Sequence, residues 1–201
     1  MPESKILSDA PTLDLLLAEI RQCRLCAEHL PLGPRPILSA STSARILIVG
    51  QAPGTRVHET GIPWNDPSGD RLRNWLGIDK NTFYDKRKIA IIPMGFCYPG
   101  KGKSGDLPPR KECATRWQAP LRSKLPNIEM TLLVGQYALQ HYLGNANKGT
   151  LTDTVKTWSD YAPQYFPLPH PSPRNNIWLK RNPWFEESVV PKLKAQCHKL
   201  L

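Results

Sequence analysis

Residues 44–50, with the sequence ARILIVG, decide the fold, because they form a short apolar run, rich in β-branched side chains, that ends at a glycine. Such a run is typical of a strand that is buried on both faces of a parallel sheet. Residues 88–94 and 130–135 have the same character, and residues 165–168 form a weaker run. The sequence therefore predicts four strands, most of them parallel.

Helical patterns lie between and beyond these strands. Leucine and isoleucine side chains recur every three or four residues in the first pattern, as on one face of an amphipathic helix. Ser68, Gly69 and Asp70 are predicted to cap the second helix, and Gly144 is predicted to end the third. The predicted helices span residues 13–20, 71–76, 137–143 and 183–201.

Strands that alternate with helices indicate a sheet covered by helices on both faces. We therefore expect an α/β fold, a three-layer α/β/α sandwich around a central, mostly parallel four-stranded sheet. A chain of 201 residues is long enough for one such domain with a substantial core. We expect a single domain over residues 1–201, in which residues 1–36 supply the first helix and a cysteine pair that pack on the core.

The charge of the chain indicates a polyanionic partner. Lysine and arginine number 27 against 17 aspartate and glutamate residues, a formal net charge of +10. Such an excess favours nucleic acid first and a membrane surface second. No apolar run reaches the roughly 18 residues that cross a bilayer, and the N-terminal sequence MPESKILSDA lacks the pattern of an export signal. We expect a soluble, cytoplasmic protein.

Ligands of parallel sheets bind beside the carboxyl ends of the strands, so the loops that follow the strands are the segments to search for chemistry. The loop after the first strand begins with Gln51-Ala52-Pro53-Gly54 and later carries Trp64, Asn65 and Asp66. An indole ring can stack on a planar base, and a carboxylate can orient water or stabilise positive charge on a sugar. In the alternative interpretation Trp64 packs under the loop and Asp66 caps the next helix.

The loop after the fourth strand has the sequence HPSPRNN, residues 170–176. Its two prolines make it stiff, and His170 at the strand end is placed to donate a hydrogen bond to a ligand oxygen. Arg174, Lys180 and Arg181 are interleaved with tryptophans in a pattern typical of nucleic-acid binding. The alternatives are an ordinary loop histidine, a Ser-Pro turn and a solvated basic surface.

Several segments together resemble the uracil-DNA glycosylase superfamily. The likeness is strongest to its iron-sulfur members of the family 4 type, while residues 66–70, DPSGD, are similar to the family 5 type. It extends over residues 23–184 and implies a monofunctional DNA glycosylase that flips uracil or another deaminated or modified base out of DNA and excises it hydrolytically in base-excision repair. The segments are GQAPG (50–54), TGIPW (60–64), SGDRL (68–72), FCYPG (96–100), VGQYALQHYLG (134–144) and HPSPRNN (170–176).

The resemblance assigns roles to individual residues. Trp64 matches the stacking aromatic, and His170 the histidine that stabilises negative charge on the departing base. Because Ala52 stands where the GQDPY version has its catalytic aspartate, another residue must activate the water. Asp66 is the first candidate for this role, and Glu59 and His58 are the next. The implied base-binding residues are Gln51, Ala52, Trp64, Asn65 and Pro93. Pro171, Ser172, Pro173 and Arg174 match the segment that fills the minor groove. Lys180 and Arg181 are predicted to bind DNA from the basic and aromatic pattern alone.

Two positions depart from the superfamily pattern. Ala52 stands where the GQDPY version has its aspartate, and Pro93 stands where an asparagine reads uracil. Proline offers no side-chain donor or acceptor. Uracil selectivity is therefore relaxed, moved to Gln51 or Asn65, or lost in favour of another base.

The chain has five cysteines, and in the reducing cytosol they are not expected to form disulfides. Metal binding, catalysis and burial remain as their uses. The resemblance implies that Cys23, Cys26, Cys97 and Cys113 hold a structural [4Fe-4S] cluster, the first two from beside the N-terminal helix and the last two from the loop after the second strand. Thiolates suit tetrahedral zinc equally well, so zinc or no metal remain alternatives. Cys197 lies outside the pattern.

Two other classes of protein compete with the enzyme. One is a catalytically weakened or inactive DNA-binding module of the same fold, which Ala52 and Pro93 would suit. The other is a nucleotide- or phosphate-binding enzyme that uses GQAPG as a cradle, but neither a P-loop lysine nor a dinucleotide glycine triplet follows the strand. We expect a monomer that binds DNA, without a nucleotide cofactor and without a membrane.

Overall fold

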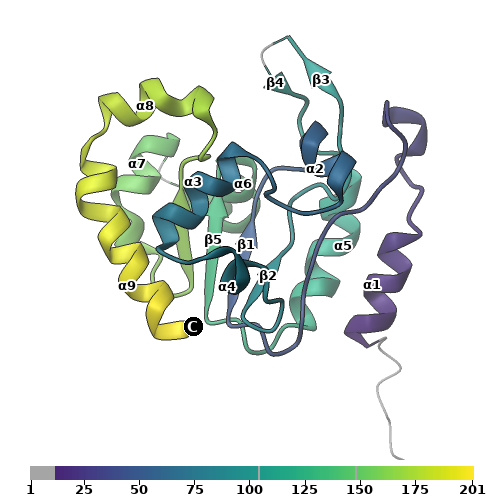
Figure 1. Ribbon diagram of the computed structural model, residues 1–201, viewed down its shortest axis with the longest axis horizontal. Coiled ribbons are helices and arrows are strands. Elements are labelled where there is room, and N and C mark those ends of the chain that lie inside the picture. The colour runs from purple at the N-terminus through teal and green to yellow at the C-terminus, as the bar shows by residue number, and fades with distance from the viewer. Residues whose placement is uncertain (1–11, 104, 148) are drawn as a thin grey trace, which may run out of the picture.

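The computed structural model describes residues 12–103, 105–147 and 149–201. Its main sheet has four strands in the order β2-β1-β5-β6, and every neighbouring pair is parallel (Figure 1). The predicted three-layer α/β/α class is confirmed. The strands are β1 (Ile46–Val49), β2 (Ile89–Ile91), β5 (Met130–Val134) and β6 (Tyr165–Leu168).

The side chains of each strand alternate between two apolar cores. In β1, Leu47 and Val49 enter one core, while Ile46 and Ile48 enter the other, so all four side chains are buried. This is the arrangement expected when helices cover both faces of a parallel sheet. The first core is closed by α1 (Leu13–Arg21), α5 (Lys111–Ser123) and α6 (Gln136–Leu143). The second is closed by α3 (Pro67–Leu76), α4 (Lys80–Tyr84), α7 (Leu151–Lys156) and α9 (Val190–Leu200).

The N-terminal helix α1 packs against α5 at one side of the molecule (Figure 1). Its four apolar side chains are buried, as the spacing of leucine and isoleucine predicts. Residues 1–11 of the predicted 1–36 segment lie outside the described residues. In the part of the chain that the structure describes, no helix has the length and apolar character needed to cross a membrane.

The predicted cap of the second helix is wrong. Helix α3 begins at Pro67, and Asp66 is its N-cap, with Oδ1 accepting a hydrogen bond from the Gly69 N–H at 2.9 Å. Ser68, Gly69 and Asp70 therefore lie inside the first turn. Proline is favoured at the first helical position because its missing N–H would have no helical partner there, which explains the earlier start.

Several short elements have no clear signal in the sequence and were not predicted. These are α2 (Thr55–Thr60), α4, α5, α7, α8 (Asn176–Arg181) and a hairpin of β3 (Lys101–Gly102) with β4 (Gly105–Asp106). Helix α5 is the longest of them and carries Pro120 in its interior. The predicted C-terminal helix is correct in place, but it begins as a π-helical turn over Phe185–Val189 before α9.

The strand over 88–94 is shorter than predicted, since β2 ends at Ile91. Beyond its end, the Met94 and Gly95 N–H groups donate to the carbonyls of Gly50 and Gln51 at 2.8 and 2.9 Å. These bonds hold the loop after β2 against the loop after β1. Pro93 is thereby fixed beside Gly50 and Gln51 at the carboxyl edge of the sheet.

Candidate active site and cysteine cavity

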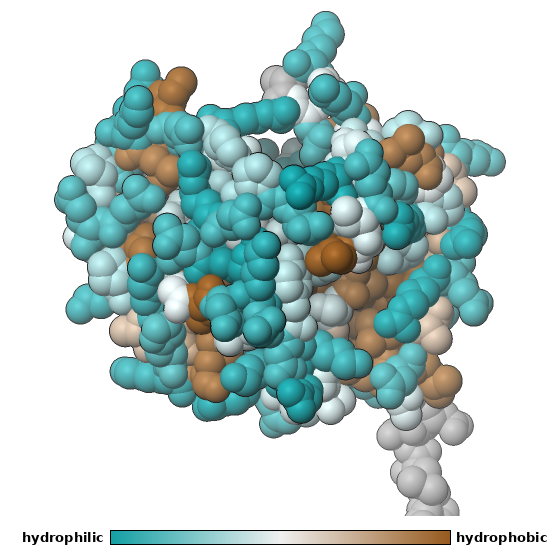
Figure 2. Space-filling model, in the orientation of Figure 1, coloured by the Kyte–Doolittle hydropathy of each residue, from teal (hydrophilic) through white to brown (hydrophobic). Residues whose placement is uncertain are grey.

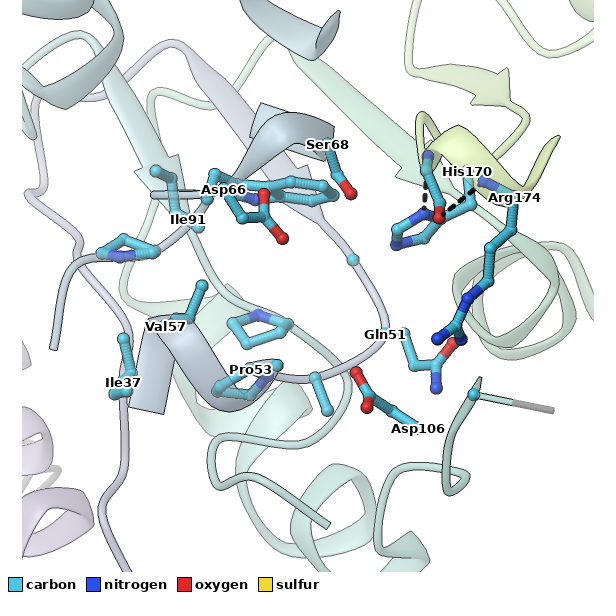
Figure 3. Close-up of a pocket in the computed structure, with 18 of the residues that line it drawn as sticks. Ile37, Gln51, Pro53, Val57, Asp66, Ser68, Ile91, Asp106, His170 and Arg174 are labelled. Atoms are coloured by element: carbon cyan, nitrogen blue, oxygen red, sulfur yellow. Dashed lines mark hydrogen bonds between the residues drawn. The ribbon is translucent and has the colours of Figure 1, made fainter. Parts of the chain in front are cut away.

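A cavity of about 490 Å³ opens at the carboxyl edge of the sheet (Figure 3). Its volume lies in the range typical of small-molecule sites. The loops after β1, β2 and β6 all contribute to it, so segments distant in the sequence meet there. The predicted site residues that line it are Gln51, Ala52, Trp64, Asp66, Pro93, His170, Ser172, Pro173 and Arg174. We call it the base cavity.

Other predicted residues lie outside the lining of the base cavity. Glu59 is exposed at the end of α2, where its carbonyl accepts a hydrogen bond from Arg35 Nη1 at 3.0 Å. His58 is buried on the same helix with its ring 6.1 Å from that of Tyr98. The remaining predicted residues outside the lining are Asn65, the buried Pro171, and Lys180 and Arg181 on the exposed face of α8.

Trp64 is held at the wall of the base cavity by close contacts with two glycines. A Cβ at Gly50 would stand 2.7 Å from Trp64 Cζ2, and a Cβ at Gly69 would stand 1.7 Å from the Trp64 carbonyl oxygen. Trp64 itself has a left-handed backbone with φ of 56°. Such a conformation is unfavourable for a bulky residue and persists only where its surroundings enforce it. The ring faces the cavity as a platform on which a planar ligand can stack.

His170 lies beside this platform, with its ring centroid 5.7 Å from that of Trp64 and the two planes inclined by 33°. Its Nδ1 accepts a hydrogen bond from the Ser172 N–H at 3.2 Å, so a neutral ring carries its proton on Nε2. Burial lowers the pKa of His170 below its usual value, although the nearby Asp66 charge opposes this change. The arrangement favours a neutral imidazole that donates an N–H into the cavity.

Asp66 is both the N-cap of α3 and a lining residue of the base cavity. One carboxylate oxygen caps α3, and the side chain also lines the base cavity (Figure 3). The alternative interpretation of Asp66 as a helix cap therefore describes a real contact. Capping leaves the second carboxylate oxygen to the cavity.

The far wall of the base cavity is apolar and rigid. Pro93 is buried there, and its carbonyl accepts a hydrogen bond from Gln118 Nε2 at 2.7 Å. Gln118 Oε1 in turn accepts from the Tyr142 hydroxyl at 2.9 Å, and burial raises the pKa of Tyr142 to about 12. A buried network in which each group has a partner holds the end of β2 in one position. Pro93 therefore offers the cavity only carbon atoms.

Gln51 connects the loops around the base cavity. Its Nε2 donates to the Leu107 carbonyl at 3.1 Å, which ties the loop after β1 to the segment that follows the β3–β4 hairpin. The loop after β6 is tied to α3 in the same way, since Arg71 donates to the Ser172 carbonyl at 3.2 Å and to Asn176 Oδ1 at 2.8 Å. The cavity walls are thus cross-linked by side-chain hydrogen bonds.

Asp106 is a lining residue that was not predicted from the sequence. It comes from β4, opposite Lys101 in the hairpin register, and its side chain points toward the base cavity (Figure 3). Partial burial raises the pKa of the Asp106 carboxyl, while the charges of Arg174 and Lys101 oppose that change. Strands of two residues carry no periodic pattern, so no signal in the sequence marks this residue as part of the site.

The four cysteines of the predicted cluster all line a second, narrow cavity of about 30 Å³. Cys23 and Cys26 follow α1, and Cys97 follows β2. Cys113 lies on the first turn of α5, and its expected place in the loop after β2 is therefore wrong. We call this the cysteine cavity. Cys197 is buried on α9 in the other core.

The chemistry of the cysteine cavity fits a thiolate-bound metal group. Burial raises the pKa of Cys97 to about 11 and that of Cys113 to about 12, so without a cation both thiols stay protonated at neutral pH. A metal cation displaces such protons and leaves thiolate ligands. The Phe96 N–H donates to Cys113 Sγ at 3.4 Å, and burial raises the pKa of Cys26 while the nearby Arg110 opposes that change. Both groups would stabilise negative sulfur.

The arrangement of these side chains does not match a single bound ion. Within residues 12–103, 105–147 and 149–201, no three histidine, cysteine, aspartate or glutamate side chains are placed to hold one metal ion. Tetrahedral zinc needs all four sulfurs at about 2.3 Å from one point. The thiols thus share a cavity without sharing one coordination centre.

The chain matches the model of a known protein family. The family model described as the uracil DNA glycosylase superfamily matches residues 38–194. The matched region contains every residue of the base cavity except Ile37. Cys23 and Cys26 precede the matched region.

Proposed function

Because the chain belongs to the uracil DNA glycosylase superfamily, we propose that it excises uracil or another deaminated base from DNA by hydrolysing the N-glycosidic bond. The observation that carries this proposal is the convergence of Trp64, Gln51 and His170 on one cavity. Enzymes that act on a base in a duplex must first turn the nucleotide out of the stack. A pocket with an aromatic wall and a hydrogen-bond donor is suited to receive it.

The base is proposed to stack on Trp64 and to meet the carbon surface of Pro93 at the far wall. Base stacking on an aromatic side chain contributes about 1–3 kcal/mol per base and tolerates different bases. Because Pro93 has no polar side-chain group, selectivity among bases falls to Gln51 and the backbone around it. This supports a wider range of deaminated bases than uracil alone.

The leaving base is proposed to be stabilised by His170. Cleavage of the glycosidic bond leaves negative charge on the base and positive charge on the sugar. A neutral imidazole with its N–H directed into the cavity can donate to the base oxygen as that charge develops. The hydrogen bond from Ser172 to Nδ1 supports this role, because it fixes the tautomer.

The DNA backbone is proposed to bind around the mouth of the base cavity. Pro173 and Arg174 line that mouth, and Lys180 and Arg181 lie on α8 next to it in the chain. Figure 2 shows hydrophilic side chains around the hollow beneath the projecting hairpin. A net charge of +10 supports attraction of a polyanion.

A [4Fe-4S] cluster is proposed for the cysteine cavity, held by Cys23, Cys26, Cys97 and Cys113. Such a cluster would supply a structural cross-link between the N-terminal segment, the loop after β2 and α5. Four thiols from three segments supply the all-sulfur ligand set that iron-sulfur clusters use, and the same set also suits zinc. Hydrolysis of a glycosidic bond requires no redox step.

The activity is tested with duplexes that contain a single uracil, hypoxanthine or xanthine. After incubation, alkali cleaves the strand at each abasic site, and we expect cleavage with at least one of the three. His170→Ala at the same concentration is the matched control and should give far less product. Absence of abasic sites with all three bases, together with salt-sensitive DNA binding, would instead indicate an inactive DNA-binding module.

The cofactor is tested on protein purified under anaerobic conditions. A [4Fe-4S] protein is brown, absorbs broadly near the blue end of the visible spectrum, and contains iron and acid-labile sulfide in equal amounts. A colourless preparation with one equivalent of zinc would contradict the cluster.

A further inference from the structure

The β3–β4 hairpin adds a second carboxylate to the base cavity, in addition to Asp66. We propose that Asp106 is a catalytic residue that faces the sugar of the flipped nucleotide and orients the water that attacks it. This inference rests on the proposed glycosylase function. It assigns the attacking water to a residue that lies outside every motif recognised in the sequence.

The position of Asp106 indicates that its carboxylate lies next to the sugar of the flipped nucleotide and not next to the base. The hairpin projects from the body of the molecule, and Asp106 is exposed although it lines the cavity (Figure 1). Ile91 and Pro93, by contrast, are buried lining residues. Asp106 is therefore at the mouth, and Pro93 is at the far wall. A nucleotide that enters base first leaves its sugar at the mouth.

Two segments distant in the chain lie close to the Asp106 carboxylate. A Cβ at Gly54 would stand 3.3 Å from Asp106 Oδ2, so the carboxylate lies against the loop after β1. A Cβ at Gly105 would overlap Arg174 Nη1, so the guanidinium of Arg174 packs on the hairpin next to Asp106. Segments from β1, β2 and β6 therefore meet at this carboxylate.

The charges around Asp106 suit a general base. Arg174, Lys101 and Asp66 are the charged groups that act on it, from the loop after β6, from β3 and from the N-cap of α3. The two cations hold the carboxylate in its charged form near neutral pH. Partial burial raises its pKa above the ordinary value, which makes it a stronger proton acceptor than an exposed aspartate.

The other groups near the cavity are less suited to activate water. Ala52 has no acceptor, and Glu59 lies outside the lining. Asp66 lines the cavity, but one of its oxygens accepts the Gly69 N–H at 2.9 Å as the cap of α3. In Figure 3 the Asp66 carboxylate lies beside Ser68, whereas Asp106 lies on the opposite side of the view, near Gln51 and Arg174. Asp66 also closely follows Trp64 in the chain. Asp66 therefore lies nearer the base platform.

Asp106 assists the hydrolysis as the acceptor of the water proton. The bond between C1′ and the base nitrogen breaks, and its electron pair leaves with the base, where the His170 N–H stabilises the charge. The water oxygen forms the new bond to C1′, and the water proton moves to the Asp106 carboxylate. Asp106 then releases this proton to solvent, and the base anion takes up a proton from solvent.

The experiment compares Asp106→Asn with wild type in single-turnover excision from the three modified duplexes. Loss of a general base costs about 10²- to 10⁴-fold in rate. We expect the excision rate to fall by that factor with every duplex that the wild type cleaves. The Kd for a duplex that carries an uncleavable 2′-fluoro analogue of the same nucleotide should change by less than about threefold, since salt screens the effect of one lost surface charge. Asp14→Asn on α1 removes the same charge far from the cavity and should leave both values unchanged.

The dependence of the excision rate on pH distinguishes a catalytic role of Asp106 from a purely structural role in the β3–β4 hairpin. The wild-type rate should fall on acidification as Asp106 takes up a proton, whereas Asp106→Asn should be slow at every pH and lose that part of the profile. The excision rate should fall less in Asp66→Asn than in Asp106→Asn. If the wild type is active and Asp106→Asn is equally active, the role of Asp106 is overturned while the proposed function stands. A wild type inert on all three duplexes would overturn both this role and the proposed function.

Discussion

The base cavity and the cysteine cavity differ in almost every property, yet one segment builds walls of both. The base cavity holds about 490 Å³ and carries carboxylates, an imidazole and a guanidinium, while the cysteine cavity holds about 30 Å³ and is mainly apolar apart from its thiols and Arg110. Along the chain, Pro93 and Asp106 line the first, and Cys97 and Cys113 line the second. Residues 93–113 thus contribute in turn to the wide base cavity and to the narrow cysteine cavity. A cross-link in the closed site would fix the walls of the open one.

The largest expected effect comes from Cys113→Ser. The variant should lose the visible absorption of the proposed cluster, and the excision rate should fall because the loop after β2 loses its anchor. Structural metal sites contribute on the order of 10 kcal/mol to the folding of the segments they join. Absorption spectra, iron content and thermal unfolding measure the change.

The matched control is Cys197→Ser, which alters a buried thiol outside the cysteine cavity. It should keep the visible absorption. Its free energy of unfolding should fall by only about 1–3 kcal/mol, the cost of placing a hydroxyl in an apolar core. Equal absorption in the two variants would show that Cys113 holds no cluster.

His170→Ala should reduce the single-turnover excision rate about 10²- to 10³-fold, the usual cost of removing one donor to developing negative charge. The Kd for an uncleavable duplex should change little, since the donor acts mainly in the transition state. His141→Ala removes an imidazole from the exposed side of α6 and serves as the control. A His170→Ala rate equal to wild type would remove His170 from the mechanism.

Trp64→Ala should weaken binding of the uncleavable duplex by about 5- to 150-fold, which corresponds to the 1–3 kcal/mol of one stacked base. Trp64→Phe keeps an aromatic face and should recover most of the affinity. Fluorescence anisotropy of a labelled duplex measures both. If the alanine variant binds as tightly as the phenylalanine variant, the base does not stack at this wall.

Acidification should destabilise the fold through His170. Its native pKa lies below the unfolded value of 6.5, so the unfolded chain binds more protons at a pH between the two values. The stability contributed by the neutral ring is complete above pH 6.5 and is lost as the pH falls through the native pKa. Each pH unit that separates the two pKa values corresponds to about 1.4 kcal/mol of unfolding free energy. Urea unfolding at pH 8 and pH 5 should show a larger loss for wild type than for His170→Gln, and an equal loss would contradict the lowered pKa of His170.

The smallest expected effect concerns Lys180 and Arg181 on α8. Each cation that contacts a phosphate adds about 0.9 to the slope of log K against log salt. Lys180→Ala and Arg181→Ala should each reduce the slope by about that amount without changing the ranking of the three bases. Lys80→Ala, on α4, should leave the slope unchanged. Unchanged slopes in all three variants would place the DNA elsewhere.

The four strands of the main sheet could be predicted from the sequence because each is a continuous apolar run between polar loops. Helix α5 could not, since Pro120 and several charged residues interrupt its apolar pattern and its register is set by tertiary contact of Trp117 and Leu121. The start of α3 was ambiguous, because Asp66 and Ser68 are both good capping residues. The contact that decides between them is a bond from Gly69 to Asp66.

The site divides in the same way. His170 stands in the loop directly after β6, and Trp64 lies between α2 and α3 in the connection that follows β1. The rule that ligands bind at the carboxyl edge of a parallel sheet therefore finds both. Asp106 arrives on a short hairpin whose direction depends on packing against Arg174 and on the bond from Gln51 to Leu107. These contacts join distant parts of the chain, and no local pattern encodes them.

The two hydrogen bonds from Arg71 to the loop after β6 have a consequence for the speed of damage search. They anchor HPSPRNN to the helix that follows Trp64, so in the proposed glycosylase this loop and Trp64 would move along a duplex as one rigid unit. The conformational entropy of this loop is lost once, when the protein folds, so no further ordering cost arises at each nucleotide that the protein contacts. A scanning protein built this way can sample many positions per encounter.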